Sequence, residues 1–357
     1  MNRVVRKNDK RPSIVGTGLI ALDVVLNGDV SKPVMFATGG TCGNVLMNLA
    51  YLGWQSFPVA RVSLDWAGSQ IVRDFKKLGV NSQFLHMEPV CSTPIVIHRI
   101  KMSTNGIATH AFSMFCPNCR RRLPGYRPVT IKSVDSETIK STQPNVFFFD
   151  RSSPGALRLA RNAKDSGALV VFELSGKAPA NQTRDAFDLA HIIKYSDIRE
   201  ADVPKMDRRT PFIEIVTRGE RGLSFRCKLK KCRQNHWQHI DGFSLTGIKD
   251  TAGAGDWCTA GLIDRLGVGG AATLNDLKRD QLKECFRYAQ ALAVINCLFE
   301  GARGSMYALS QSDLREFVKL VLRGKPTPET SPTKVQGSNS NGSDCPICSS
   351  DSQFAVA

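Results

Sequence analysis

The chain has 357 residues, of which 42% are hydrophobic and 22% are charged, as is typical of a soluble globular protein. It contains no run of about 18 apolar residues and no apolar stretch after its basic N-terminal extension (residues 1–12), which argues against a membrane span and a secretory signal and predicts a cytoplasmic protein. The 48 Lys and Arg residues against 32 Asp and Glu residues give a net charge of +16, which favours anionic ligands such as nucleotides, sugar phosphates or nucleic acid.

The first apolar segment, residues 13–18, is predicted to be a β-strand that ends in small residues. Residues 16–21 match the dinucleotide-binding pattern G-x-G-x-x-A, so a dinucleotide-dependent oxidoreductase is one alternative. That pattern should open a helix and be followed about 20 residues later by an acid. Here residues 24–26 and 34–38 have the composition of strands, and the second run ends in two glycines with no acid, which argues against this alternative.

A glycine-rich turn, residues 39–44 (GGTCGN), leads into a predicted helix over residues 45–52. It is followed by a predicted strand, a helix and the start of another strand, over residues 59–63, 68–78 and 79–80. Two β runs then cover residues 93–100 and 107–115, with Asn105-Gly106 between them. Asn-Gly between two β runs is a strong hairpin signal, and we therefore predict a β-hairpin here.

From residue 146 onward, short apolar strands alternate with helices. The predicted strands cover residues 146–149, 168–172, 192–193, 212–217 and 223–225, and the predicted helices cover residues 155–166, 184–190, 285–299 and 312–322. Uniformly apolar strands separated by helices are typical of a parallel sheet that is covered on both faces. Beyond Gly324 the composition shifts to Pro, Thr, Ser, Asn and Gly, so we predict a disordered tail over residues 324–357.

Residues 250–256 (DTAGAGD) form a turn of small residues that leads into a predicted helix over residues 257–266. Glycines allow a close backbone approach to a ligand, and the free N–H groups at a helix start bind anions. A carboxylate here repels an anion, but it is useful if Asp256 takes a proton from a hydroxyl that then attacks a phosphoryl group. The alternative is a tight turn in which Asp256 caps the helix.

Residues 250–261 (DTAGAGDWCTAG) resemble the C-terminal signature of the PfkB/ribokinase-type carbohydrate kinases, and residues 39–53 resemble their N-terminal signature. The resemblance covers residues 13–322. It implies an α/β, ribokinase-like fold with a central, mainly parallel sheet flanked by helices and a small β lid. In this interpretation the kinase domain spans residues 13–323, and the lid is built from about 23–38 and 90–116.

The resemblance implies an ATP- and Mg²⁺-dependent kinase that phosphorylates a hydroxyl of a sugar, sugar phosphate or nucleoside. The implied catalytic groups are the base Asp256 and the anion-hole residues Gly253, Ala254 and Gly255. The implied sugar-binding residues are Asp23, Gly39, Gly40 and Asn44. The implied ATP-binding residues are Thr217, Gly219, Gly222, Gly301 and Ala302. Glu200 would hold Mg²⁺ through water, and Asp250 is either a ligand of a monovalent cation such as K⁺ or a turn cap.

Two positions depart from the family pattern. The Asn of the family's N-x-x-E run is Asp197 here, which accepts but does not donate hydrogen bonds, and an Asp after a central strand is Glu173. With the net charge, these departures motivate an alternative function, a non-catalytic relative that binds nucleic acid or a protein partner, although the intact G-A-G-D motif argues against it. The sequence has no P-loop and none of the motifs of protein kinases. We expect a monomer, or a homodimer that pairs through the lid.

Two C-x-x-C pairs remain, at Cys116 and Cys119 and at Cys345 and Cys348. Together they have the ligands of a structural zinc site, but only if the C-terminal segment folds back onto the first pair. Our main interpretation is that they are surface thiols, and a zinc site remains an alternative. Other cysteines lie in apolar segments, as buried hydrophobic residues do.

Overall fold

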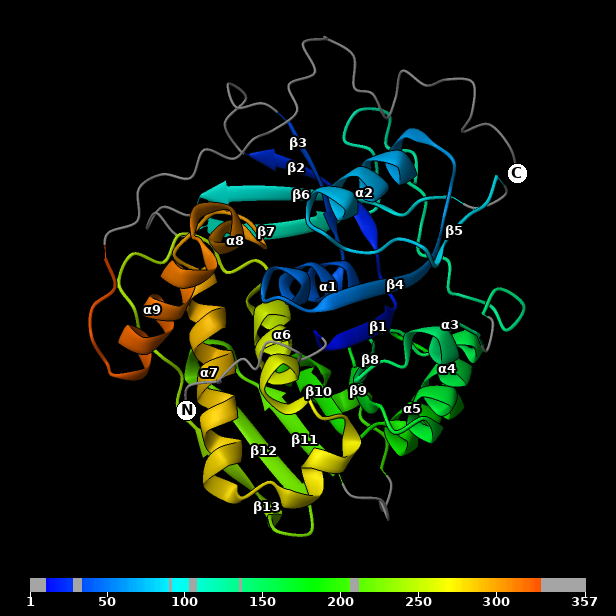
Figure 1. Ribbon diagram of the computed structural model, residues 1–357. Helices are drawn as coiled ribbons and strands as arrows, with labels where there is room; N and C mark the ends of the chain where they lie inside the picture. Colours follow the sequence, from blue (N-terminus) through cyan, green and yellow to red (C-terminus); the bar gives the residue numbers. More distant parts are fainter. Residues whose placement is uncertain are drawn as a thin grey trace.

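The structure, a computed structural model, describes residues 11–27, 34–89, 92–102, 108–134, 137–205 and 212–328. Within these ranges the strands form a large sheet and a small sheet (Figure 1). The large sheet contains, from edge to edge, β13 (Arg233–Ile240), β12 (Leu223–Lys228), β11 (Phe212–Thr217), β10 (Ile192–Ser196), β9 (Leu169–Glu173), β8 (Val146–Phe149), β1 (Ser13–Thr17), β4 (Gln55–Val62) and β5 (Leu85–Met87). The small sheet contains β3 (Met35–Gly39), β2 (Ala21–Asn27), β6 (Ile95–Met102) and β7 (Ala108–Ser113).

In the large sheet, neighbouring strands run parallel from β11 through β10, β9, β8, β1 and β4 to β5. Strands β12 and β13 extend the β11 edge as antiparallel strands. The helices are α1 (Thr41–Tyr51), α2 (Trp66–Lys77), α3 (Glu137–Thr142), α4 (Pro154–Asp165), α5 (Ala180–Leu189), α6 (Ala254–Leu266), α7 (Arg279–Asn296), α8 (Gly304–Ala308) and α9 (Gln311–Leu322). In Figure 1, α1, α6 and α7 cover one face of the sheet, and α3, α4 and α5 cover the other. None of the described helices is long and apolar enough to cross a bilayer.

The sheet is buried on both faces because successive strand residues point to opposite layers. In β1, Ile14 packs with the α1 and α6 side, whereas Val15 packs with the α4 and α5 side. Phe148 and Phe147 in β8 divide in the same way. This explains the uniformly apolar strands, and the predicted α/β class with a mainly parallel sheet is confirmed.

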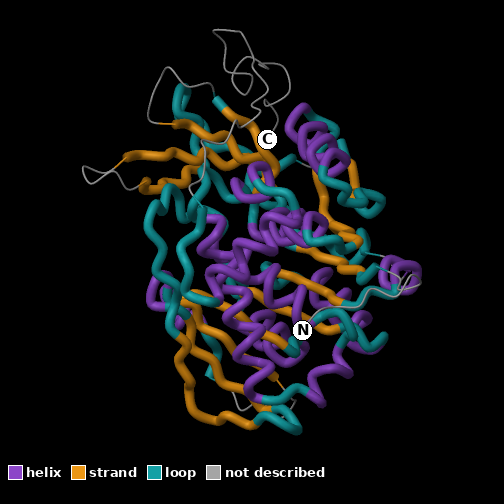
Figure 2. The backbone as a smooth tube through the Cα atoms, turned by 60° about the vertical axis from the view of Figure 1, so that its left-hand side comes forward, coloured by secondary structure: helices purple, strands orange, loops and turns teal. Residues whose placement is uncertain are grey.

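The small sheet lies at one end of the molecule, apart from the large sheet (Figure 2). β2 pairs with β3 in antiparallel fashion and with β6 in parallel fashion, and β6 and β7 form the predicted antiparallel pair. The Asn105-Gly106 turn lies outside the described residues. Leu22 and Ile97 pack on one face of this sheet, against Ala67 of α2, and leave Asp23 and His98 for the other face.

Some local predictions differ from the structure. α1 begins four residues before the predicted helix, directly after Gly40, whose φ of 80° breaks the preceding strand. A strand at residues 79–80 was predicted wrongly, because Gly79 has a φ of 72° and ends α2. β13 escaped prediction because its polar sequence is that of an exposed edge strand. The predicted N-terminal extension and C-terminal tail lie mostly outside the described residues.

Candidate active site

The turn before α6 has a backbone that only glycine adopts comfortably. Gly253 is the N-cap of α6 with a φ of 72°, and a Cβ atom at this position would lie 2.2 Å from the carbonyl oxygen of Ala302. Gly253 therefore lets the 301–302 loop pack directly on the helix start. The first turn of α6 presents backbone N–H groups and the positive end of the helix dipole at this point, which is the predicted anion site.

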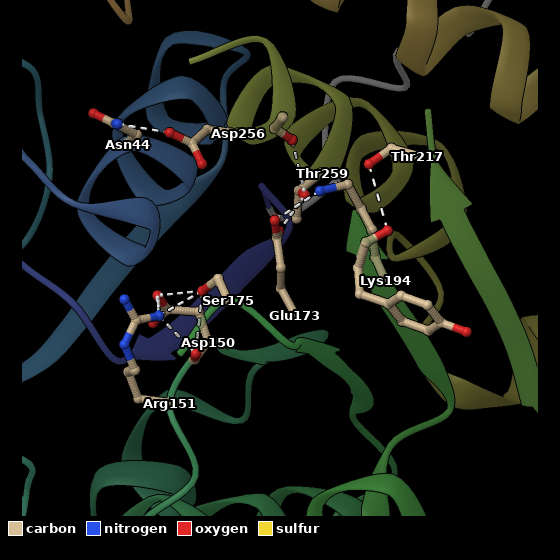
Figure 3. A network of polar contacts seen from close by, with 11 residues as sticks. Asn44, Asp150, Arg151, Glu173, Ser175, Lys194, Thr217, Asp256 and Thr259 are labelled. Atoms are coloured by element: carbon tan, nitrogen blue, oxygen red, sulfur yellow. Dashed lines mark hydrogen bonds and ion pairs between the residues drawn. The ribbon is translucent and has the colours of Figure 1, made fainter. Parts of the chain in front are cut away.

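Asp256 lies in that first turn and contacts a residue from the N-terminal part of the chain. Asn44 of α1 donates a hydrogen bond from Nδ2 to Asp256 Oδ2 at 2.6 Å, and Figure 3 shows the two side chains pointing toward each other. Burial, together with the charge of Glu173, raises the pKa of Asp256 to about 8, although the hydrogen bond from Asn44 and the charge of Lys194 oppose this rise. The predicted base and a predicted sugar-binding residue thus meet in space.

The other predicted sugar-binding residues surround this pair. Asp23 of β2 lies directly against Gly39 of β3, where a Cβ atom would be 1.9 Å from Asp23 Oδ2. Gly40 carries the chain into α1, and a Cβ atom there would lie 2.4 Å from the carbonyl oxygen of Leu19. At both positions a neighbouring atom approaches the backbone so closely that only glycine, which has no side chain, fits. Burial raises the pKa of Asp23 to about 7, and the charge of Arg303 partly opposes this rise.

A buried ion pair lies beneath the start of α6. Lys194 of β10 donates to Glu173 Oε1 at 2.7 Å, and Thr259 of α6 donates to Glu173 Oε2 at 2.6 Å (Figure 3). Burial alone would lower the pKa of Lys194, but the carboxylates of Glu173 and Asp256 raise it. Lys194 is 2% exposed, and a Cβ atom on Gly255 would lie 3.9 Å from its Nζ. The Lys194–Glu173 pair is therefore bonded to the first turns of α6 through Thr259, and it places the positive charge of Lys194 near Asp256.

A second polar cluster lies where β8 and β9 end. Asp150 is 1% exposed; its Oδ1 accepts from the N–H of Leu19 at 2.9 Å, and its Oδ2 accepts from Arg151 Nη1 at 2.7 Å and from Ser175 at 3.1 Å. Gly18 gives it room, since a Cβ atom there would lie 1.6 Å from Asp150 Oδ1. This cluster holds the loop that leads into the small sheet.

Two histidines connect the small sheet to the turn before α6. His98 Nε2 and His110 Nδ1 are 2.6 Å apart, and His110 Nε2 lies 2.6 Å from Asp250 Oδ1. Asp250, which is 2% exposed, also accepts from the N–H of Ala252 at 2.7 Å and of Gly301 at 2.8 Å. Burial lowers the pKa of His98 to about 4, as does the nearby His110. Asp250 thus contacts three segments of the chain: β7 at His110, the turn before α6 at Ala252, and the 301–302 loop at Gly301.

A pocket of about 410 Å³ lies between the small sheet, the end of α2 and α8. Its lining includes Asp23, Thr38, His98, Gly301, Ala302 and Arg303. Arg303 donates to Asn44 Oδ1, so the pocket connects through one amide to Asp256. The pocket therefore adjoins the cluster formed by the predicted base and sugar-binding residues.

The predicted phosphate-binding turn of ATP is a separate part of the structure. Thr217 ends β11, and Gly219 and Gly222 follow in a tight turn with φ values of 59° and 93°. Glu200 is near this turn, because Arg218 Nη2 donates to its Oε1 at 2.8 Å. Gly301 and Ala302 lie instead beside Asp250 and Gly253.

Comparisons with known proteins bear on the fold of the chain. No family model matches the sequence. The Arabidopsis thaliana protein "Probable fructokinase-5" is 26% identical over 326 residues, which cover 82% of this chain and 93% of that protein. The structure of fructokinase with bound ATP from Xylella fastidiosa matches with a TM-score of 0.67 and 16% identity, over 86% of this chain and 98% of that one.

A fructokinase double mutant from Vibrio cholerae O395, bound to fructose, ADP and potassium ion, matches with a TM-score of 0.64 and 18% identity over 87% of this chain and all of that one. The predicted resemblance to the PfkB/ribokinase-type carbohydrate kinases is borne out, because the chain is similar in sequence to a probable fructokinase and shares the fold of solved fructokinases. The predicted ribokinase-like fold with its small β lid is therefore confirmed. The alternative of a dinucleotide-binding protein is wrong, because its pattern should open a helix, whereas residues 16–21 lead into strand β2.

These similarities do not by themselves assign the site residues, whose roles stay predictions. Sequence reasoning missed several of the groups that shape this site, above all Lys194 and Arg303. Lys194 carried a usable signal, because a lysine inside an apolar strand must be paired when it is buried. Arg303 carried none, since its contact with Asn44 joins residues 259 positions apart.

No metal-binding cluster of three or more His, Cys, Asp or Glu side chains occurs in the described part of the chain. Cys116 is buried and Cys119 is exposed, whereas Cys345 and Cys348 lie outside the described residues, so the zinc alternative stays untested. A different pair, Cys227 and Cys232, is buried with its sulfur atoms 3.2 Å apart.

Proposed function

We propose that this protein transfers the γ-phosphate of ATP to a hydroxyl of a sugar, sugar phosphate or nucleoside, with Asp256 as the catalytic base. The observation that carries the proposal is the position of Asp256 in the first turn of α6, beside the glycine turn and within 2.6 Å of Asn44. The same residue can thus face an acceptor hydroxyl and adjoin an anion-binding helix start. The fructokinase neighbours bound to ATP, or to fructose and ADP, support the substrate pair.

In the proposed reaction, the acceptor lies against Asp23, Gly39, Gly40 and Asn44, and its reacting hydroxyl lies beside Asp256. Asp256 accepts the hydroxyl proton as the oxygen attacks the γ-phosphorus of ATP, and ADP leaves. The N–H groups of Gly253, Ala254, Gly255 and Asp256 would stabilise the transferred phosphoryl group. A pKa of about 8 suits a base that works near neutral pH.

ATP would bind along Thr217, Gly219 and Gly222. Gly301 and Ala302, predicted beside its adenine, lie instead against Asp250 and Gly253 and line the pocket that contains Asp23. Bound Mg²⁺ would neutralise charge on the β- and γ-phosphates. We propose Glu200 as its holder through water, because the side chain is 47% exposed and, among the described residues, only its Oε1 is engaged, by Arg218. Asp250 is the proposed neighbour of a monovalent cation, but its Oδ1 is already contacted by Ala252 and His110.

The test measures ADP release from ATP and Mg²⁺ across a panel of sugars, sugar phosphates and nucleosides. Asp256→Asn should lower turnover by about 10²–10⁴-fold while retaining ATP binding. Asp185→Asn, an exposed change of the same kind on α5, is the matched control and should behave like wild type. Wild-type activity in Asp256→Asn would exclude Asp256 as the base.

The alternative proposal, a non-catalytic relative, predicts no turnover with any acceptor. Binding of nucleic acid that weakens steeply with salt, in the absence of ATP turnover, would favour it. The cytoplasmic location and the monomeric or homodimeric state also stay proposals, and sedimentation of the purified protein would decide the second.

A further inference from the structure

Arg303 is a buried cation that has no carboxylate partner in the described part of the chain. It is 5% exposed. Its Nη1 donates to Asn44 Oδ1, and its Nε and Nη2 both donate to Tyr307 Oη at 3.3 Å. These acceptors are neutral. Buried charges in folded proteins are normally paired with an opposite charge, because an uncompensated charge destabilises the fold strongly.

The Arg303 guanidinium group also has N–H donors without an acceptor among the described residues. Each terminal nitrogen carries two N–H groups, and the contacts above use one on each, so one N–H per terminal nitrogen has no partner among the described residues. Arg303 also lines the 410 Å³ pocket. A planar guanidinium with free donors beside a pocket suits a carboxylate or phosphate group, which accepts such hydrogen bonds in pairs.

The acidic groups of the pocket leave this charge available. Asp23, Asp74 and Glu300 line the pocket, and none lies within ion-pair distance of Arg303 in the described structure, although the charge of Arg303 acts on Asp23 and lowers its pKa. Asp74 Oδ2 accepts from the N–H and the hydroxyl of Thr38 at 2.8 and 3.0 Å. Burial raises the pKa of Asp23 to about 7, so that this group is partly protonated at neutral pH and can donate as well as accept. Asp23 therefore suits a sugar hydroxyl.

We infer that the acceptor is an anionic sugar, one that carries a phosphate ester or a carboxylate, and that Arg303 is the residue that binds this group. The inference rests on the proposed kinase function and narrows its substrate class. Arg303 and Asp256 contact opposite ends of the Asn44 amide. A sugar bound across Asn44 would thus place its anionic group at Arg303 and its reacting hydroxyl at Asp256.

The first experiment measures equilibrium binding by calorimetry, without ATP, so that it does not depend on catalysis. The probes are glucose, glucose 6-phosphate, gluconate, fructose, fructose 6-phosphate, ribose and ribose 5-phosphate. At least one anionic sugar should bind about 10-fold to 100-fold more tightly than its neutral counterpart. Preference for a phosphate or for a carboxylate identifies which anionic group the pocket accepts. Failure of every anionic sugar to bind better than its neutral counterpart overturns the inference.

The second experiment compares Arg303→Gln with Arg303→Lys and with Arg158→Gln, an exposed charge change on α4. Arg303→Gln should abolish the preference for the anionic sugar, Arg303→Lys should retain part of it, and Arg158→Gln should leave it intact. In turnover assays the loss should appear in KM for the anionic acceptor and not in KM for the neutral one. Circular dichroism checks folding, and the lysine variant keeps the test decisive if the glutamine variant does not fold.

The outcomes separate this inference from the proposed function. ATP-dependent transfer to neutral sugars alone would sustain the kinase proposal and overturn the anionic acceptor. An equal loss of kcat with all acceptors in Arg303→Gln would show that Arg303 acts on the transferred phosphoryl group, which also overturns it. Arg303-dependent binding of an anionic sugar without any transfer would support the inference and contradict the proposed function.

Discussion

His110 of the small sheet lies 2.6 Å from Asp250, the residue that opens the turn before α6. Asp250 also holds the N–H groups of Ala252 and Gly301, so one carboxylate connects the lid, the glycine turn and the loop beside the pocket. The lid is therefore fastened to the segment that carries the proposed base, in addition to its contacts with α2. Several measurable properties of the protein depend on this and related contacts.

Replacing His110 by Ala should loosen the lid. The change removes the contact between the imidazole ring and the buried carboxylate of Asp250. Hydrogen exchange of the β7 amides should accelerate by about 10-fold or more, and KM for the acceptor should rise more than kcat falls. His236→Ala, on exposed β13, is the control and should leave exchange in β7 unchanged. Unaltered β7 exchange in His110→Ala would show that the lid is held by its apolar face alone.

The activity should rise with pH through about 8. Asp256 acts as a base only when it is ionised, and its pKa in the resting protein is about 8, so the active fraction grows as pH increases through that value. Asn44→Ala removes a hydrogen bond that favours the ionised form and should shift the rise to higher pH. The measurement is kcat/KM against pH for both proteins. A profile that is flat between pH 6 and 9 would contradict the assignment.

Asp256 should also lower stability at neutral and alkaline pH. Its pKa in the folded state is above the ordinary value of 3.8, so the folded state binds this proton more tightly than the unfolded chain. The stability associated with that proton is fully present below pH 3.8 and is lost as pH rises through 8. Asp256→Asn should therefore raise Tm by about 2–4 °C at pH 8, and by less at pH 5. Asp185→Asn should show no such pH-dependent gain.

Gly253→Ala and Gly79→Ala form a matched pair. Both glycines have a φ of 72°, but a Cβ atom at Gly79 meets no atom within 4 Å, whereas one at Gly253 would lie 2.2 Å from the carbonyl oxygen of Ala302. Gly79→Ala should cost about 1 kcal/mol through backbone strain alone. Gly253→Ala should cost at least about 1–2 kcal/mol more and should weaken ATP turnover. Urea denaturation of both variants measures the difference, and equal losses would show that the 301–302 loop moves aside freely.

Replacing Lys194 by Met should be costly. It leaves Glu173 buried and bonded only to Thr259 among its present partners, and the loss of one member of a buried ion pair costs about 3–5 kcal/mol. Lys194 also lowers the pKa of Asp256, so the pH–activity rise should move upward. The double variant with Glu173→Gln should recover part of the stability. A loss no greater than that of an exposed lysine, such as Lys319→Met, would contradict this role.

The sequence predicts the fold well where local patterns decide it. The apolar strands from residue 146 onward indicated a parallel sheet because residues such as Phe147 and Phe148 pack in opposite layers. The glycine turns before α1 and α6 were visible because glycine and a helix start leave a strong local pattern. The edge strand β13 was missed because its burial pattern is that of a polar, solvent-facing strand.

The candidate site was only partly predictable, because its groups come from distant segments. Family resemblance pointed to Asn44 and Asp256, but it did not show that they contact each other. His110 lies in a predicted strand, and nothing in the local pattern indicates that it reaches Asp250. Arg303 drew no attention, since nothing in its neighbours indicates that it reaches Asn44. Such contacts depend on tertiary packing and leave no periodic signal in the sequence.

The separation of Asn44 and Asp256 by 212 positions also affects how the protein must be made. Asn44 is synthesised 212 residues before Asp256 and 259 residues before Arg303, its two partners. A nascent or truncated chain that stops after β13 would contain all the described strands of the large sheet, but it would lack the start of α6, the proposed base Asp256 and the buried Arg303. Ligand binding at this site can therefore assist folding only after α6 and Arg303 have been produced.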